Sequence, residues 1–424
     1  MIVKHPHPHE GSALNPIRAT ARKLHVPLPL VADVKMRANG ARRMTKESNG
    51  DRRNTLTGDC RLRTAPRFRF TNLLSRLGLL LAGLVATAPA LQADAQDRVI
   101  IQQPGGSRFP ISGLIDDYTG REVRIQVRTG DPLRRYPRQE VIEVQTDYTP
   151  HHEKGRQLLA AGKPAEARAE LTQALKEEDR IWVRREILSQ LVRCALWDGN
   201  YRAATPWFLS IVESDPETLH YGLAPLAWSD VPSEPAVKLD ARNWMADRSP
   251  ESQLIGASHL LFDRELNDQA EVALRRLARE SNVKLQRLAQ MQLWRVRSQG
   301  GTATPGELTR WELAIDELPE ELRIGGYFVL GQTYKRQHQP ERAAGLLLWV
   351  PLVYDADRHL AARACFDAAE LVESYGDLAQ AANLYSEVAF RFGDTPLGGK
   401  GDAKWRKLRE TMATPERPDK APVP

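Results

Sequence analysis

The feature that most constrains how this chain can fold is a repeated spacing of turn residues after Tyr148. From there on, segments of roughly 12 to 16 residues with helical periodicity follow one another in pairs, with Gly, Asn or Pro between them. The turn residues Gly162 and Gly199 lie 37 positions apart, and His338 and Gly376 lie 38 apart. Because one helix pair of this kind cannot bury its apolar face alone, the spacing predicts an array of stacked pairs.

Four of these units place small and bulky residues at matching positions. Small residues let the two helices of a pair approach closely, and bulky ones fill the space to the next pair. The matching residues are Gly155, Leu158, Gly162, Ala167, Leu171 and Ala174 in the first unit, Leu188, Leu191, Gly199, Ala204, Phe208 and Pro216 in the second, Tyr327, Leu330, Gly331, Tyr334, Ala343 and Leu347 in the third, and Ala369, Val372, Gly376, Ala381 and Tyr385 in the fourth. The pattern resembles the tetratricopeptide repeat (TPR) over residues 149–394.

The middle of this stretch departs from the pattern. Residues 252–281 form a further pair whose turn lacks the usual Gly, and residues 282–319 form a degenerate pair with a break at 301–305. Residues 221–250 are an insertion that contains Trp228 and Trp244. Such an insertion either covers a groove or helix end as a lid or packs its tryptophans against the repeats, and packing is the simpler interpretation.

The resemblance implies a TPR-like α-solenoid of about five to six helix pairs, in which the first helix of each pair lines a concave groove. Mixed charge with aromatic residues on that surface suits an extended peptide or a partner helix. Phe328 and Phe366 share these helix faces, and packing between repeats explains them equally well. The residues that the repeat positions assign to partner binding are Glu186, Arg193, Trp197, Gln332, Lys335, Arg336, Glu370 and Glu373.

Residues 96–148 precede the helices and show the alternation of short β-strands. Candidate strands at 99–101, 111–115, 122–127 and 141–144 are separated by turn signals at 117–120 and 129–132. Four or five short strands in this length resemble a small SH3-like β module, a type of domain that commonly docks partners. The exposed docking candidates are Tyr118, Arg121, Arg134, Arg135 and Tyr136. In the alternative interpretation Tyr136 closes the barrel and the arginines are only solvated.

The basic charge of the chain belongs to its first 76 residues, which hold 16 Lys and Arg against 5 Asp and Glu. We expect residues 1–76 to be a disordered basic leader or the product of a start assigned too far upstream. An uncharged apolar stretch and the small residues of 93–95 follow, in the order of a secretory signal peptide, so residues 77–95 predict export and cleavage after Ala95. A membrane anchor fits less well, because about 20 apolar residues are needed to span a bilayer. Residues 397–424 are expected to form an extension with a disordered tail from Thr411.

The sequence contains none of the common catalytic or metal-binding motifs, such as paired Cys and His spacing, HExxH, a phosphate-binding loop or a nucleophile elbow. We therefore expect no catalytic residue, no metal site and no cofactor. Cys194 and Cys365 lie on apolar helical faces, where cysteine usually acts as a small buried hydrophobe. The residues after Arg76 carry 44 basic and 49 acidic side chains, a net charge of −5 that disfavours nucleic acid as a partner.

The resulting hypothesis is a mainly α protein, a TPR-like solenoid preceded by a small all-β module, that acts as an exported, non-catalytic scaffold in the periplasm or outside the cell. Its partners would be other envelope proteins or peptides bound in the groove, and homo-oligomerisation stays open. The alternative is an anchor that binds peptidoglycan or polysaccharide through the β module, with the repeats as a spacer. An enzyme would require a closed pocket around Trp228 and Trp244.

Overall fold

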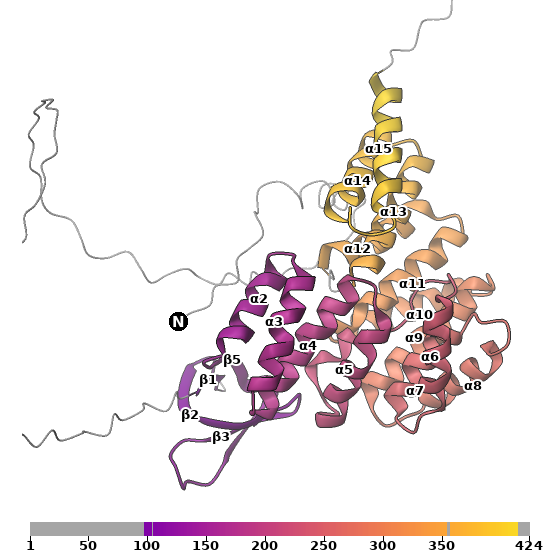
Figure 1. Cartoon of the computed structure of the whole chain (residues 1–424). Coiled ribbons are helices and arrows are strands. Elements are labelled where there is room, and N and C mark those ends of the chain that lie inside the picture. Colours follow the sequence, from indigo (N-terminus) through magenta and orange to yellow (C-terminus); the bar gives the residue numbers. More distant parts are fainter. Residues whose placement is uncertain (1–96, 104, 354–356, 414–424) are drawn as a thin grey trace, which may run out of the picture. The chain divides into compact units, whose positions relative to one another are not determined.

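The fold consists of a small antiparallel sheet followed by a long series of helices (Figure 1). The computed structural model describes residues 97–103, 105–353 and 357–413. The predicted basic leader, the signal peptide, the cleavage site after Ala95 and the end of the C-terminal tail lie outside the described residues. In the part of the chain that is described, no helix combines the length and apolar character that crossing a membrane requires.

Five strands form the sheet: β1 (Asp97–Gln102), β2 (Arg108–Tyr118), β3 (Glu122–Gln126), β4 (Arg134–Pro137) and β5 (Val141–Gln145). Their order is β4-β3-β2-β1-β5, so the chain runs as a meander and then returns β5 to the free side of β1. A short 3₁₀ turn, η1 (Arg138–Glu140), makes that return. The pairing of β2 with β3 shifts register between Ile115 and Asp117, and such a bulge bends a strand. The predicted strands are confirmed, and β4 is added to them.

The helices begin directly after the sheet and continue to the end of the described chain. They are α2 (Pro150–Ala160), α3 (Pro164–Glu177), α4 (Ile181–Trp197), α5 (Tyr201–Ser214), η2 (Leu219–Leu223), α6 (Pro235–Ala246), α7 (Pro250–Leu260), α8 (Asn267–Leu277), α9 (Val283–Gln299), α10 (Pro305–Asp316), η3 (Glu320–Leu322), α11 (Arg323–Arg336), α12 (Pro340–Val353), α13 (Arg358–Ser374), α14 (Leu378–Arg391) and α15 (Gly398–Ala413).

Four of the helix pairs share one turn geometry, and it falls at the four aligned turn residues. Gly162, Gly199, His338 and Gly376 all have a positive φ, between 57° and 94°. This left-handed conformation ends the first helix of a pair, and it is the usual helix-ending device. The helical repeat is therefore visible in the backbone as well as in the sequence.

The residues that follow each turn are buried at the same two positions. The fifth residue after the turn is an alanine that lets the helices approach, and the ninth is a bulky residue that fills the space between them. None of these eight side chains is more than 1 % exposed: Ala167, Leu171, Ala204, Phe208, Ala343, Leu347, Ala381 and Tyr385. Glycines opposite two of the bulky residues complete the contact, since a Cβ on Gly155 or Gly331 would lie 2.6 or 2.7 Å from the leucine side chain.

His338 is the one non-glycine residue with a positive φ in the described ranges, at 57°. Left-handed backbone costs a residue with a Cβ about 1–2 kcal/mol, whereas glycine adopts it freely but loses more entropy on folding. We expect His338→Gly to raise the free energy of unfolding by about 0.5–1 kcal/mol. Gln337→Gly is the control, because Gln337 has a φ of −85° and gains nothing from glycine. Urea unfolding of both variants checks this, and equal destabilisation by the two would contradict it.

The insertion at 221–250 packs against the repeats and does not form a separate lid. Trp228 is buried against α11, where a Cβ on Gly325 would lie 2.3 Å from the indole ring. Helix α6, inside the insertion, packs tightly on α7, because a Cβ on Gly256 would lie 2.3 Å from the backbone nitrogen of Met245. The ring of Trp244 lies edge-on to His259, with 6.1 Å between centroids. The simpler interpretation of the two tryptophans is thus confirmed.

His259 joins α7 to this insertion and is buried in its neutral form. Its Nε2 lies 3.0 Å from the carbonyl oxygen of Pro225, and its Nδ1 lies 2.8 Å from Ser233 Oγ. Burial lowers the pKa of His259 to about 4. Because the unfolded chain binds this proton near pH 6.5 and the folded chain only near pH 4, the stability is full above pH 6.5 and falls as the pH approaches 4.

We expect the free energy of unfolding to fall by on the order of 2 kcal/mol between pH 7 and pH 4 through this one group. His259→Gln keeps a donor for Pro225 and removes the titration, so its stability should fall less over the same range. Urea midpoints at both pH values measure the difference. Parallel pH profiles for the wild type and the variant would contradict the assignment.

The C-terminal end requires a correction. The disordered tail predicted from Thr411 starts inside α15, which continues to Ala413. Gly398 lets the start of α15 approach Gly393 just after α14, Gly401 packs against Val388 of α14, and the indole of Trp405 lies edge-on to Phe390. Packing therefore outweighs the low helix propensity of the glycines.

Candidate functional site

Most of the residues predicted to line the groove are engaged in polar contacts within the protein. Lys335 Nζ on α11 lies 3.2 Å from Asp367 Oδ1 and 3.3 Å from Glu370 Oε2, both on α13. Gln332 donates to the second oxygen of Asp367 at 2.6 Å, and Arg363 donates to that oxygen at 2.9 Å. Asp367 is buried, so these cations and the amide neutralise and solvate a carboxylate inside the repeat array. The contacts hold α11 against α13.

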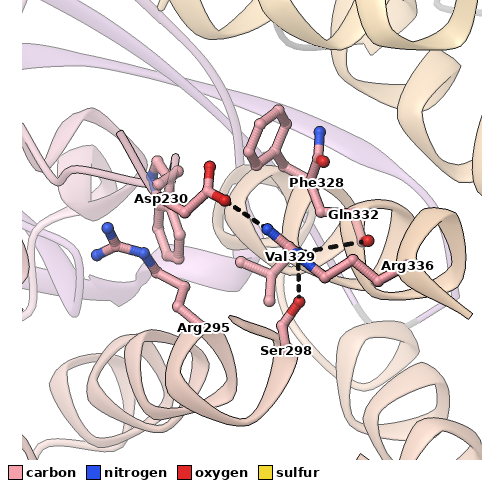
Figure 2. Close-up of a pocket in the computed structure, with 8 residues that line it drawn as sticks. Asp230, Arg295, Ser298, Phe328, Val329, Gln332 and Arg336 are labelled. Carbon is pink, nitrogen blue, oxygen red and sulfur yellow. Dashed lines mark hydrogen bonds and ion pairs between the residues drawn. The ribbon is translucent and has the colours of Figure 1, made fainter. Parts of the chain in front are cut away.

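Arg336 contacts the insertion instead of open solvent (Figure 2). Its guanidinium donates to Asp230 and, at 2.9 Å, to Ser298 Oγ on α9. Arg295 lies on the same side and donates to the backbone oxygens of Ser258 and Ser229. The cavity left among these side chains measures about 10 Å³, the space of about one water molecule. This part of the predicted groove holds no room for a ligand.

The remaining predicted groove residues are spread over several surroundings. Trp197 stacks under the Arg358 guanidinium, 4.5 Å from the ring centre, and its Nε1 donates to Asp394 at 3.0 Å. Glu373 accepts from Tyr385 at 2.7 Å and from Lys404 at 2.9 Å. Phe328 and Phe366 are buried, in agreement with packing between repeats, and Arg193 is exposed. Glu186, in contrast, lines a larger cavity.

That cavity measures about 280 Å³ and lies where the sheet meets the helices. We call it the junction pocket. Its wall comes from the end of β2, from β5, from the start of α4 and from the segment that runs from the end of α5 into η2. The lining residues are Tyr118, Thr119, Gly120, Ile142, Glu143, Val144, Tyr148, Trp182, Arg185, Glu186, Asp215, Thr218, Leu219 and His220.

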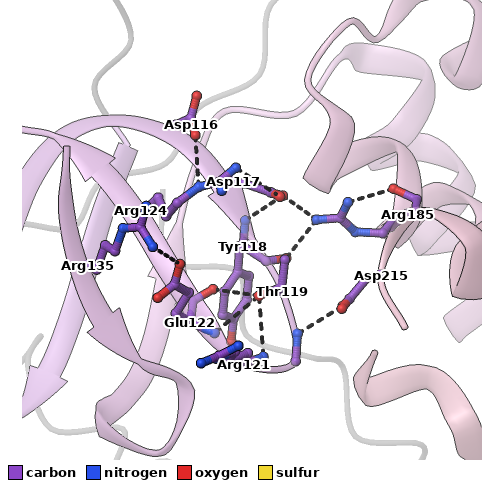
Figure 3. A network of polar contacts seen from close by, with 12 residues as sticks. Asp116, Asp117, Tyr118, Thr119, Arg121, Glu122, Arg124, Arg135, Arg185 and Asp215 are labelled. Carbon is purple, nitrogen blue, oxygen red and sulfur yellow. Dashed lines mark hydrogen bonds and ion pairs between the residues drawn. The ribbon is translucent and has the colours of Figure 1, made fainter. Parts of the chain in front are cut away.

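The first wall of the junction pocket is fixed by polar contacts between sheet and helices (Figure 3). Arg185 on α4 is buried, and its guanidinium bonds the carboxylate of Asp117, the backbone oxygen of Tyr118 at 3.1 Å and Ser214 Oγ at 2.8 Å. The amide of Gly120 donates to Asp215 Oδ2 at 2.8 Å. A Cβ on Gly120 would lie only 1.8 Å from the backbone oxygen of Glu217, so only glycine fits at this position of the turn.

A second set of contacts ties the start of β1 and the segment after β5 to the start of α4. Arg180, just before α4, donates to Glu178 and to Thr146 Oγ1, and that hydroxyl in turn donates to the buried Asp97 at 2.5 Å. The same guanidinium lies 5.7 Å from the ring centre of Trp182. The sheet also shares one apolar core with α3 and α4. The sheet and the first helices therefore form one packed body around the junction pocket.

Aromatic rings supply the apolar surface of the pocket. Tyr118 and Trp182 meet edge to face, with 6.4 Å between centroids, and Tyr148 contacts His152 at 4.3 Å. Burial raises the pKa of Tyr118 and raises the pKa of Tyr148 to about 12, so both phenols stay neutral at physiological pH. Ile142 on β5 is 43 % exposed beside them. An apolar wall that solvent can reach is typical of a binding surface.

Glu186 is the acidic group at the centre of this surface. Its side chain is 40 % exposed, and Oε1 accepts from Gln190 at 3.1 Å. Oε2 lies 3.9 Å from His220 Nε2, too far for a hydrogen bond. Burial lowers the pKa of His220, so the imidazole is neutral at pH 7 and does not cancel the carboxylate charge. The distance favours a binding site over a general acid–base pair in this conformation.

Some docking candidates of the sheet fit a role in binding, and others fit the interpretation in which Tyr136 belongs to the core and the arginines are solvated. Tyr118 lines the junction pocket, whereas Tyr136 packs against the sheet core. Arg135 is paired with Glu122 at 3.4 Å, and Arg121 and Arg134 are exposed. Sequence reasoning missed Tyr148, Trp182 and His220 as members of one site. The available signal was that two aromatic residues and Glu186 fall at the boundary between the strand-like and helix-like segments.

Neither the residues of the site nor the comparisons with known proteins assign this chain to a known class of protein. Among residues 97–103, 105–353 and 357–413, no group of three His, Cys, Asp or Glu side chains is placed to hold a metal ion. No family model matches this chain, and no curated protein matches it in sequence. The function must therefore be argued from the junction pocket itself.

Proposed function

We propose that this chain is an exported binding scaffold that holds a protein or peptide partner at the junction pocket. The observation that carries the proposal is the pocket of about 280 Å³, with three aromatic rings and the half-exposed Glu186. This volume is just below the usual range for small-ligand sites, about 300–1,000 Å³. The pocket therefore suits one or two side chains of a larger partner.

The architecture supports this proposal. The strand order β4-β3-β2-β1-β5 and the 3₁₀ turn before β5 favour the SH3-like interpretation of the sheet. The four left-handed turns and the buried alanines after them favour the TPR interpretation of the helices. Both kinds of module usually serve as binding platforms, and here they meet at one pocket. In the proposal the helical array is the support, because Lys335 and Arg336 of its predicted groove are engaged in internal ion pairs.

Export stays part of the proposal and has its own test. The small residues of 93–95 and the apolar stretch before them favour cleavage after Ala95, which leaves the sheet at the start of the mature chain. N-terminal sequencing of periplasmic or secreted material should therefore begin at Gln96. Material that begins at Met1 in the cytoplasm would contradict export.

Photo-crosslinking in the producing cells tests the binding proposal. Benzoylphenylalanine replaces Ile142 in the junction pocket, Lys335 in the predicted groove, or Val272, which is 63 % exposed on α8 and serves as the control. We expect a discrete protein adduct from position 142 and none from position 272. Adducts from position 335 alone, or from none of the three, would contradict binding at the junction pocket.

A further inference from the structure

Strand β5 is an edge strand that borders the junction pocket. In the described part of the chain β5 pairs with β1 alone, so its other side has no strand partner. An edge strand presents unpaired N–H and C=O groups and is a template for one more strand. The pairing of β1 with β5 shifts register beside Ile142, where the side chain is left exposed.

Strand β5, which pairs with no second strand among the described residues, borders the cavity. Three consecutive residues, Ile142, Glu143 and Val144, line the pocket. The register shift at Ile142 interrupts the usual alternation of side chains, so Ile142 and Glu143 are both exposed beside the cavity. The unpaired edge of β5 lies along this stretch. An extended segment placed there could bond to this edge and put a side chain into the pocket.

The charges around the cavity determine which kind of partner side chain it can bind. Glu143, Glu186 and Asp215 supply three carboxylates to the lining. Of the two basic residues in the lining, Arg185 is neutralised by its ion pair with Asp117, and His220 is neutral. Three cations on the neighbouring elements are engaged: Arg180 pairs with Glu178, Arg156 pairs with Glu153, and Lys284 donates to the backbone oxygens of Glu217 and Thr218. Arg193 on α4 is exposed, and its charge acts on His220. Asp215 is buried and accepts from the amides of Gly120 and Glu217, so Glu143 and Glu186 are the carboxylates left to a ligand.

We propose that the partner is an extended basic segment of another protein, which adds to β5 as an antiparallel or parallel strand and places a lysine or arginine beside Glu186. This inference rests on the proposed function and names the chemistry of its partner. The alkyl part of the basic side chain packs on the aromatic lining of the pocket, and its charge pairs with Glu186, because Arg156 and Arg180 already lie over the rings of Tyr148 and Trp182. Backbone hydrogen bonds supply affinity, and the cation in the pocket supplies specificity.

The test is a titration calorimetry series on the full chain with short synthetic probes. The basic probe is acetyl-Thr-Val-Lys-Val-Thr-Val-amide, and a second probe has glutamate in place of lysine. Two further probes carry N-methyl groups on alternate amides, one set on the odd and one on the even residues. Because alternate amides of a strand point to opposite sides, only one methylated set should block pairing with β5.

The expected results are binding of the basic probe, at least about ten-fold weaker binding of the glutamate probe, and a similar loss for one methylated set only. Glu186→Gln should weaken the basic probe about ten-fold and remove its advantage over the glutamate probe. Glu213→Gln, which changes an exposed carboxylate of α5 outside the lining, should leave binding within about two-fold.

Equal binding of both methylated probes would overturn strand addition, and indifference to Glu186→Gln would overturn the role of the cation. Failure of all probes to bind, together with a protein adduct from position 142, would overturn this inference while the proposed function stands. If no protein were crosslinked from position 142, the proposed function itself would be contradicted.

Discussion

Gly120→Val is expected to lower the free energy of unfolding by about 3 kcal/mol and to weaken binding at the junction pocket at least ten-fold. The added Cβ would lie 1.8 Å from the backbone oxygen of Glu217, and the contact is with backbone, so the turn must move. Moving it breaks the 2.8 Å bond from the Gly120 amide to Asp215. Both residues line the pocket, so its wall opens when they separate.

The measurement is urea unfolding of the variant combined with titration of the basic probe. Gly306→Val is the matched control, because a Cβ on that glycine of α10 would meet nothing within 4 Å. The control should stay within about 0.5 kcal/mol of the wild type. A Gly120→Val protein with wild-type stability and binding would show that the sheet and helices do not meet as described.

Gly325→Leu is expected to lower the free energy of unfolding by about 3–5 kcal/mol, the range found when a large aromatic residue leaves a core. The Cβ at this position would lie 2.3 Å from three ring atoms of Trp228, and the rigid indole can only leave its site. Its departure also loosens the insertion and exposes the apolar surface of α11. The tryptophan fluorescence should shift to longer wavelength in the same variant.

The double variant Gly325→Leu with Trp228→Ala provides the internal check. Because both changes remove one contact, the double variant should be no less stable than Trp228→Ala alone, and their effects should not add. Gly399→Leu at an open position of α15 is the control for adding leucine to a glycine site. Additive losses in the double variant would show that Trp228 and Gly325 act independently.

The repeat could be predicted from the sequence because its turn chemistry is local. Gly162, Gly199 and Gly376 mark left-handed turns that a residue without Cβ adopts easily, and the aligned spacing identified His338 as the fourth. The strands could be predicted for a similar reason, since alternating burial leaves a period of two. Helix α15 was not predicted, because it is stabilised by packing on α14 and the amino-acid composition gives no information about such contacts.

The candidate site could be predicted only in part. Repeat position placed both Glu186 and Lys335 in the predicted groove, yet one lines a cavity and the other is paired with Asp367. The difference depends on neighbours that are distant in sequence. Arg336 forms an ion pair with Asp230 of the insertion, whereas Glu186 shares a cavity with Tyr118 of the sheet. Periodicity along one helix contains no information about which other element will cover it.

Hydrogen–deuterium exchange of the full chain, with and without saturating basic probe, tests the central claim most directly. The claim is that partners bind at the free edge of β5 beside α4, and not along the helical array. We predict slower exchange at residues 141–145 when the probe is bound, with α11 and α13 unchanged. Slower exchange in α11 and α13 with residues 141–145 unchanged would contradict the claim and return the binding site to the groove.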